Sequence, residues 1–416
     1  MGTSLPEFQE QTLKNGLKVV VIPMHNDTGV ITTDIFYKVG SRNESMGKSG
    51  IAHMLEHLNF KSTKNLKAGE FDEIVKHFGG VTNASTGFDY THYYVHSSSG
   101  NLEKSLELFS EIMENLALSD EEFQDERNVV LEERLWRTDN NPTGYLYFRL
   151  FNTAYLYHSY HWTPIGFIED IKTWSIEDIR AFHKLYYQPR NAIIVVAGDI
   201  EPKRVFEATQ KYFEPIKNQG SIPAPHAIEP KQDGARRAII HKESEVEMLA
   251  LAYKIPSFSH EDQVALSALG AILSEGKSSL LQRTLVDKKQ LANEIYAYNM
   301  DLADEGLFMF IGIANEGISA LKLEEELHKQ IEKVKKGEVG EDELQKVKAN
   351  LKAEFILQLE SSSAVANLFG SYLARGNLTP LLEFEEKFST LTREKIIEVA
   401  NRYFDERSST TLILRK

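Results

Sequence analysis

The sequence predicts an α+β protein of two similar halves, each a mixed, mostly antiparallel sheet covered by helices. Three observations predict this fold class. Strand-like and helix-like patterns alternate along the 416 residues. Residues 217–236 contain prolines and glycines but no hydrophobic period, which is typical of a linker. The pieces on either side resemble each other. We therefore expect an N-terminal half at 1–216, the linker, and a C-terminal half at 237–416.

The first predicted elements are two strands and two helices. Apolar, β-branched residues predict strands over Lys18–Pro23 and Val30–Lys38, with turn residues 26–29 between them. Apolar residues spaced three and four apart predict a helix over Ser49–Phe60. A second helix is predicted over Phe71–Phe78, because two glycines follow and end it.

Five further elements complete the first half. Alternating residues predict a strand over Thr91–Ser97. Helical periods run over Leu102–Leu116 and over Glu121–Arg137, and a Ser-x-x-Glu capping box opens the second of them. A helix over Ser175–Tyr187 ends before a proline. The apolar run Ala192–Ala197 predicts a buried strand.

The similarity of the halves indicates an internal duplication. Three pairs of segments recur in the same order at nearly constant offsets of 217, 221 and 216 residues. The pairs are residues 174–187 with 391–404, residues 120–124 with 341–345, and residues 36–39 with 252–255. The alternative interpretation is chance similarity between amphipathic helices.

Composition limits the chemistry. The chain contains no cysteine, which excludes disulfides, Cys-based zinc sites, iron–sulfur clusters and a thiol nucleophile. Any metal must therefore be bound by His, Asp or Glu. The net charge of −14 disfavours nucleic acid or an anionic membrane as a partner, because both repel an acidic surface.

The sequence offers no membrane span and no signal peptide. Its longest clean apolar run lies within residues 192–198, far short of the roughly 20 residues that a spanning helix needs. The start, Met1-Gly-Thr-Ser4, lacks a charged region followed by an apolar one. We expect a soluble protein. It would be periplasmic or secreted if Met-Gly-Thr-Ser replaced a leader, and cytoplasmic otherwise.

The chemistry is concentrated in the sequence His53-Met-Leu-Glu56-His57. Two histidines four residues apart lie on one face of a helix, so both imidazoles can reach one ion. Glu56 borders the same place without having to be a ligand. This is the H-x-x-E-H order of the inverzincins. The alternative is a surface helix with two hydrogen-bonded histidines and a solvated glutamate.

A third ligand is predicted on the helix over Glu121–Arg137. Glu126 and Glu133 are seven residues apart and therefore face the same way. Glu133 would complete a set of two histidines and one glutamate with one position open, which is the catalytic pattern for zinc. Glu126 would orient a ligand histidine by a hydrogen bond. Without the histidine motif, an acidic helix of this kind is more typical of a solvated face.

Several segments resemble the pitrilysin family of zinc peptidases, which includes insulin-degrading enzyme and mitochondrial processing peptidase. They are residues 37–45, residues 50–63 around the two histidines, and residues 79–91. The resemblance covers essentially the whole chain, but it is diffuse after residue 236. The length suits the short members of the family, in which two chains close a chamber.

The resemblance assigns roles to individual residues. Its third metal ligand lies 76 residues after the second histidine, at Glu133, and its helper glutamate lies seven residues earlier, at Glu126. Its edge-strand segment, which pairs with substrate backbone, corresponds to residues that include Asn83, Ala84 and Thr86. We therefore expect one Zn²⁺ per chain, with Glu56 and Glu126 in the catalytic machinery and those three residues binding substrate.

The activity expected is that of a zinc-dependent metalloendopeptidase. Glu56 would act as the general base that takes a proton from the attacking water and passes it to the leaving amine. Substrate would bind extended, by strand addition at Asn83 and Ala84. Because this mode reads backbone more than side chains, it predicts unstructured peptides as substrates.

The C-terminal half does not repeat this site. At the 216 offset, the residues that correspond to His53, Glu56 and His57 are Leu269, Ile272 and Leu273, in that order. At the 221 offset, Val347 stands in place of Glu126, whereas Glu354 corresponds to Glu133. This half is therefore predicted to be a structural wall without a metal of its own.

One departure from the family concerns an Arg and a Tyr, seven residues apart, that contact substrate and the developing oxyanion. Here Val286 and Asn293 occupy those positions. We expect a dimer whose homologous partner supplies the pair, and a homodimer is also compatible. Two alternatives remain: a non-catalytic or conditionally active subunit that serves in assembly, and a metal-storage module. The presence of Glu56 argues against both, because neither needs a general base.

Overall fold

The structure is a computed structural model that describes residues 4–225 and 227–416. Most of the N-terminal Met-Gly-Thr-Ser stretch, on which the predicted compartment depends, lies outside the described residues. The chain folds into two compact units. The first unit comprises Met1–Arg134, Trp162–Ala227 and Ile356–Leu378, and the second unit comprises Leu135–His161, Ile228–Phe355 and Thr379–Lys416. Each unit therefore contains one segment from the sequence range of the other. The predicted division into homologous halves at 217–236 stays a prediction.

The first unit contains a six-stranded sheet in the order β1-β2-β6-β3-β5-β4. Its strands are β1 (Gln9–Thr12), β2 (Lys18–Pro23), β3 (Val30–Tyr37), β4 (Val81–Thr86), β5 (Thr91–Ser98) and β6 (Ala192–Gly198). Only the pair β2–β6 is parallel, and the other neighbours run antiparallel. The strand β4 lies at one end of the sheet.

The second unit contains a five-stranded sheet in the order β7-β11-β8-β10-β9. Its strands are β7 (Arg236–His241), β8 (Met248–Ile255), β9 (Ala292–Met300), β10 (Gly306–Ala314) and β11 (Ser409–Arg415). The pair β7–β11 is parallel and the others are antiparallel. This order matches β2-β6-β3-β5-β4 of the first unit strand for strand, with the parallel pair in the same place. The predicted fold class, two similar halves with mixed and mostly antiparallel sheets, is confirmed.

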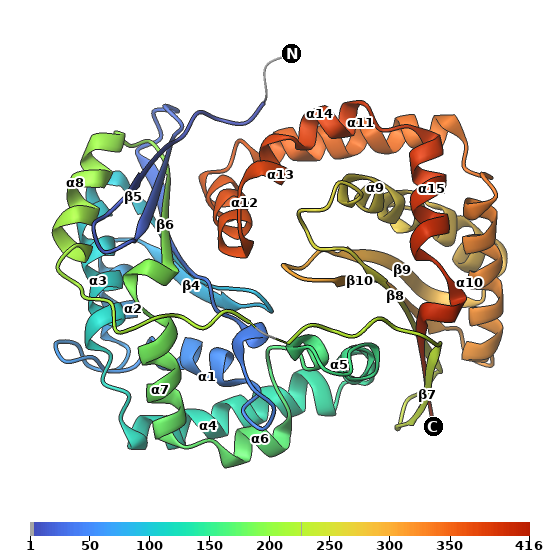
Figure 1. Ribbon diagram of the computed structural model, residues 1–416, viewed down its shortest axis with the longest axis horizontal. Coiled ribbons are helices and arrows are strands. Elements are labelled where there is room, and N and C mark those ends of the chain that lie inside the picture. Colours follow the sequence, from blue (N-terminus) through green and yellow to red (C-terminus); the bar gives the residue numbers. More distant parts are fainter. Residues whose placement is uncertain (1–3, 226) are drawn as a thin grey trace. The chain divides into compact units, whose positions relative to one another are not determined.

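Helices cover the first sheet on both faces (Figure 1). They are α1 (Ile51–Leu58), α2 (Glu70–His77), α3 (Leu102–Asn115), α4 (Asp120–Arg134), α6 (Ile168–Thr173), α7 (Ile176–Tyr186), α8 (Pro202–Phe213) and α12 (Ser362–Arg375). Apolar side chains of α1, α3, α7 and α8 pack with Ile31 and Ile35 of β3 in one core. The helix α12 packs on β3 and β6, and Gly370 lies so close to Phe36 that a Cβ would stand 2.0 Å from its ring.

Helices of the second unit pack on its sheet or on other helices of its core. They are α5 (Pro142–Ala154), α9 (Gln263–Ser274), α10 (Ala320–Lys335), α11 (Glu341–Gln358, with its last three residues in the first unit), α13 (Thr379–Leu382), α14 (Phe384–Ser389) and α15 (Arg393–Tyr403). Residues of α9, α10 and α15 form the core with β8 and β10. π-Helical turns occur at Leu135–Asp139 and Gln282–Lys288.

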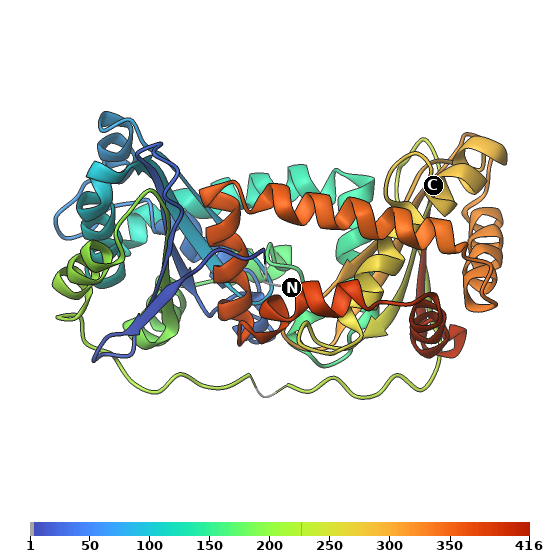
Figure 2. The same ribbon diagram turned by 90° about the horizontal axis from the view of Figure 1, so that it is seen from above.

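Most predicted elements of the first half lie within two residues of the observed ones. The largest difference is at α4, which ends at Arg134 and continues as a π-helical turn rather than as an α-helix to Arg137. Residues 217–225 and 227–235 of the predicted linker adopt neither helix nor strand (Figure 2). Within the described residues, no helix combines the length and the apolar character needed to cross a membrane.

Candidate metal centre

The helix α1 presents the histidine motif. Its apolar stripe, which includes Met54, Leu55 and Leu58, is buried in the first core. His53, Glu56 and His57 project from the remaining surface of the helix and are half-buried. The predicted helical spacing therefore places both imidazoles and the carboxylate on one face, above a packed core.

The N-terminal end of α1 is held by a buried carboxylate, that of Glu44, which was not predicted from the sequence. Glu44 accepts hydrogen bonds from the backbone N–H groups of Gly50 and Ala52, both at 2.8 Å, and from the Trp162 indole at 2.7 Å. Burial raises the pKa of Glu44 to about 8 against these three donors. Gly50 has φ 86°, and a Cβ there would lie 2.7 Å from a backbone oxygen, so glycine is required at this turn.

His53, His57 and Glu133 bring three ligand atoms together. The two Nε2 atoms are 3.3 Å apart. Glu133 Oε2, from α4, lies 3.5 Å from His53 Nε2 and 3.3 Å from His57 Nε2. Tetrahedral zinc with bonds of about 2.0–2.1 Å spaces its ligand atoms about 3.3–3.4 Å apart. The triangle therefore has the spacing that three ligands of one tetrahedral zinc ion need. Within the described residues this is the one cluster of three such groups.

Glu126 lies behind His57, where it was predicted to orient a ligand. Its Oε1 accepts a hydrogen bond from His57 Nδ1 at 2.8 Å, which leaves Nε2 for a metal. Its Oε2 lies 2.5 Å from Lys61 Nζ. Burial alone would raise the pKa of Glu126, but hydrogen bonds from His57 and Lys61 lower it. Lys61 was not predicted, although its position four residues after His57 was a signal for it.

The carboxylates of Glu126 and Glu133 stabilise positive charge at His57. Burial lowers the pKa of this imidazole, but the hydrogen bonds and charges of Glu126 and Glu133 outweigh it and raise the pKa to about 9. Such an environment suits a divalent cation that replaces the proton.

The edge strand β4 carries the predicted substrate-binding residues. Asn83 is exposed, and its side chain accepts a hydrogen bond from the backbone N–H of Ala84 at 2.9 Å. Ala84 packs against the first core. The Thr86 hydroxyl donates to Glu56 Oε2 at 2.5 Å, so Thr86 reaches the predicted base directly.

Comparison with known proteins identifies the family. Residues 19–158, which contain the whole cluster, match the family model described as Insulinase (Peptidase family M16). Residues 173–351 match the model described as Peptidase M16 inactive domain. Over 414 residues, the chain is 57% identical to the Zinc protease PqqE of Helicobacter pylori, covering 99% of this chain and 93% of that protein. The chain belongs to peptidase family M16. The predicted family resemblance is thereby confirmed.

Two further comparisons extend this result. The crystal structure of a protease from Helicobacter pylori is 57% identical, with a TM-score of 0.98 over 99% of this chain and all of that one. A protein from Schizosaccharomyces pombe named as a probable mitochondrial-processing peptidase subunit beta is 28% identical, covering 96% of this chain and 89% of its own length. The M16 fold is thus shared along the whole chain, and one relative is named as a subunit of an assembly.

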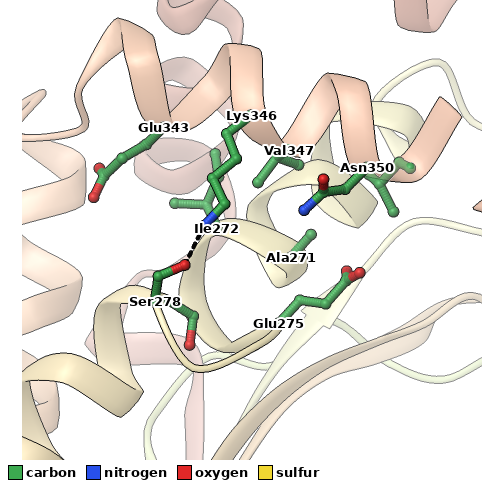
Figure 3. Close-up of a pocket in the computed structure, with 10 residues that line it drawn as sticks. Ala271, Ile272, Glu275, Ser278, Glu343, Lys346, Val347 and Asn350 are labelled. Carbon is green, nitrogen blue, oxygen red and sulfur yellow. Dashed lines mark hydrogen bonds between the residues drawn. The ribbon is translucent and has the colours of Figure 1, made fainter. Parts of the chain in front are cut away.

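The second unit holds a pocket between α9 and α11 (Figure 3). Ile272 of α9 and Val347 of α11 line it, and the predicted repeat aligns these two residues with Glu56 and Glu126. The Lys346 ammonium donates to the Ser278 hydroxyl across its edge. Glu275 lies beside Glu354, and burial together with that second carboxyl raises its pKa. This pocket has carboxyl groups in its lining, but it has apolar side chains at the two residues that the predicted repeat aligns with Glu56 and Glu126.

The positions of the M16 Arg and Tyr are occupied by residues without those functions. Val286 packs against the second core, and Asn293 is exposed at the start of β9. Arg283, three residues before Val286, forms an ion pair with Glu343. Its guanidinium is therefore held within the second unit.

Proposed function

We propose that this M16 protein is a zinc metalloendopeptidase that hydrolyses unstructured peptides. The observation that carries the proposal is the triangle of His53, His57 and Glu133, whose edges of 3.3–3.5 Å match tetrahedral zinc. Glu56, one residue before His57, supplies a carboxylate that a purely structural zinc site does not need.

A zinc ion at this site supplies a Lewis acid that lowers the pKa of water and polarises a carbonyl. The residues of the chain do the remaining work. Glu56 accepts a proton from the attacking water and returns it to the leaving nitrogen. Glu126 holds the His57 ring through Nδ1, and Lys61 keeps Glu126 charged.

Substrate backbone would pair with β4. This strand lies at the end of the sheet next to α1, so one side of its backbone can accept another strand. The exposed Asn83 lies beside the Ala84 N–H and can exchange its hydrogen bond for one to substrate. Recognition through backbone hydrogen bonds requires an extended chain, which favours disordered peptides over folded proteins.

The proposal is tested by metal content and peptide cleavage. The purified protein should contain about one zinc ion per chain and should cleave a disordered peptide. EDTA should stop cleavage but leave the far-ultraviolet circular dichroism nearly unchanged, because the ligands stand on helices packed on their own core. Global unfolding on chelation would mean that the metal is structural. Cleavage that persists in metal-free protein would refute the zinc mechanism.

We further propose that full activity needs a homologous partner chain with which this subunit closes a chamber. The observation is that Val286, packed against the second core, and the exposed Asn293 stand at the positions where the family has its Arg and Tyr. Loss of one oxyanion donor costs about 10²–10³ in rate. A partner that keeps the Arg and Tyr but lacks H-x-x-E-H would complete one site. The relative from Schizosaccharomyces pombe, named as a subunit, supports an assembly.

The partner proposal is tested by comparing the lone chain with mixtures. Mixing with a homologue that carries the Arg and Tyr should raise the cleavage rate by about 10²–10³. The double variant Val286→Arg, Asn293→Tyr should raise the rate of the lone chain in the same direction. A lone chain that cleaves as fast as the mixture, with no gain in the double variant, would instead indicate a self-sufficient peptidase.

A further inference from the structure

The strand β4 has two hydroxyl groups on one face, with different partners. Side chains alternate along a strand, so Thr82, Ala84 and Thr86 share a face while Asn83 points to the other. Ala84 packs into the first core, which identifies that face as the one toward the helices. The Thr82 hydroxyl donates to the Tyr94 carbonyl at 2.9 Å within the sheet. The Thr86 hydroxyl instead leaves the sheet and donates to Glu56 Oε2 at 2.5 Å.

This hydrogen bond joins β4, which is proposed to bind substrate, to α1, which carries the proposed base. The backbone of Glu56 is fixed because α1 is packed in the core and held at its N-terminal end by Glu44. Its side chain still has three rotatable bonds, and a base works only within about 2.6–3.2 Å of the proton that it takes. A hydroxyl that holds Oε2 restricts these rotations and so fixes where the carboxylate lies.

We propose that Thr86 is a positioning residue for Glu56, an inference that rests on the proposed peptidase function. From the sequence, Thr86 was expected to bind substrate. The structure favours a different role, since its hydroxyl is already committed to the carboxylate. The same strand, β4, also pairs with the substrate backbone in the proposed mechanism. It would therefore position both the scissile bond and the general base. Geometry of this kind is worth much in rate, since a misplacement of about 1 Å can cost 10²-fold.

Three substitutions separate positioning from substrate contact. Thr86→Val keeps the shape and removes the donor, and should lower kcat by about 10–10² with little change in KM or zinc content. Thr86→Ser restores a hydroxyl and should recover most of kcat. Thr82→Val, the matched control, removes a hydroxyl from the same face that does not reach Glu56. It should leave kcat within about twofold of the unmodified protein.

Other patterns would overturn the assignment. A raised KM with unchanged kcat would make Thr86 a substrate contact. Loss of zinc from Thr86→Val would make it a support of the metal site. If Thr86→Ser has a kcat no higher than that of Thr86→Val, or if Thr86→Val keeps the full kcat, the hydroxyl does not position Glu56.

If the unmodified protein cleaves no peptide, the proposed function is refuted, but the contact between Thr86 and Glu56 can still be tested. A structural measurement does so. Crystal structures of the unmodified protein and of Thr86→Val, at a resolution that shows alternate conformers, should differ at Glu56. We expect one ordered carboxylate in the unmodified protein and several rotamers in the variant. A single identical Glu56 conformer in both crystals would overturn the positioning role.

Discussion

Glu56→Gln is expected to abolish nearly all hydrolysis while the protein keeps its zinc. Loss of a general base costs about 10²–10⁴ in rate. The amide has the size of the carboxylate, and its oxygen can still accept the Thr86 hydroxyl, so the local geometry should survive. What disappears is the capacity to take a proton from water. The measurements are kcat on a disordered peptide and zinc per chain.

The control for Glu56→Gln lies in the metal content of the same sample. His53, His57 and Glu133 are unchanged, so zinc should remain near one ion per chain. If Glu56→Gln loses its zinc, the carboxylate acts in metal binding rather than as the base. Full activity in this variant would show that another group takes the proton.

Glu133→Gln is expected to weaken zinc binding itself. It replaces the charged member of the ligand triangle, whose Oε2 lies 3.3–3.5 Å from both imidazole nitrogens, by a neutral amide. Removing an outer partner of a ligand typically costs 10–100-fold in affinity, so loss of a ligand should exceed about 10²-fold. Competition with a chelator measures the affinity, and excess zinc should restore part of the activity.

Glu132→Gln is the matched control for this second variant. Glu132 is the neighbouring residue on α4 but is exposed, whereas Glu133 is half-buried beside the histidines. The control should keep both zinc and activity, and both variants should retain their circular dichroism. Unchanged zinc affinity in Glu133→Gln would mean that the triangle is not the metal site.

Local patterns in the sequence predicted most of the first half. The strand Lys18–Pro23 was predicted with its observed boundaries, because a run of β-branched residues next to turn residues depends only on near neighbours. The histidine helix was predicted for the same reason, since spacing along a helix decides which side chains share a face. The repeat was also predicted, because three pairs of similar segments follow one another in the same order at nearly constant offsets.

Residue spacing and the family resemblance predicted which residues form the candidate site, but not how they pack together. Two histidines four apart and two glutamates seven apart fix their faces on α1 and α4. Whether those faces meet depends on how the helices pack, which the residues by themselves did not establish. Helix spacing made Glu133 a candidate third ligand, and the family resemblance assigned it that role. Asn83, Ala84 and Thr86 at an edge strand came from the resemblance alone.

The sequence by itself therefore determined the family, the duplicated α+β fold and the residue types that can bind zinc. Tertiary structure alone decided the ligand triangle, the Lys61–Glu126 contact, the Glu44 support of α1 and the bond from Thr86 to Glu56. It also decided that residues 135–161 and 356–378 belong to the unit opposite their sequence neighbours. The physical reason is range. Backbone preference and amphipathic spacing act over a few residues, whereas these contacts join groups 6 to more than 100 positions apart whose meeting is settled by packing of the whole core.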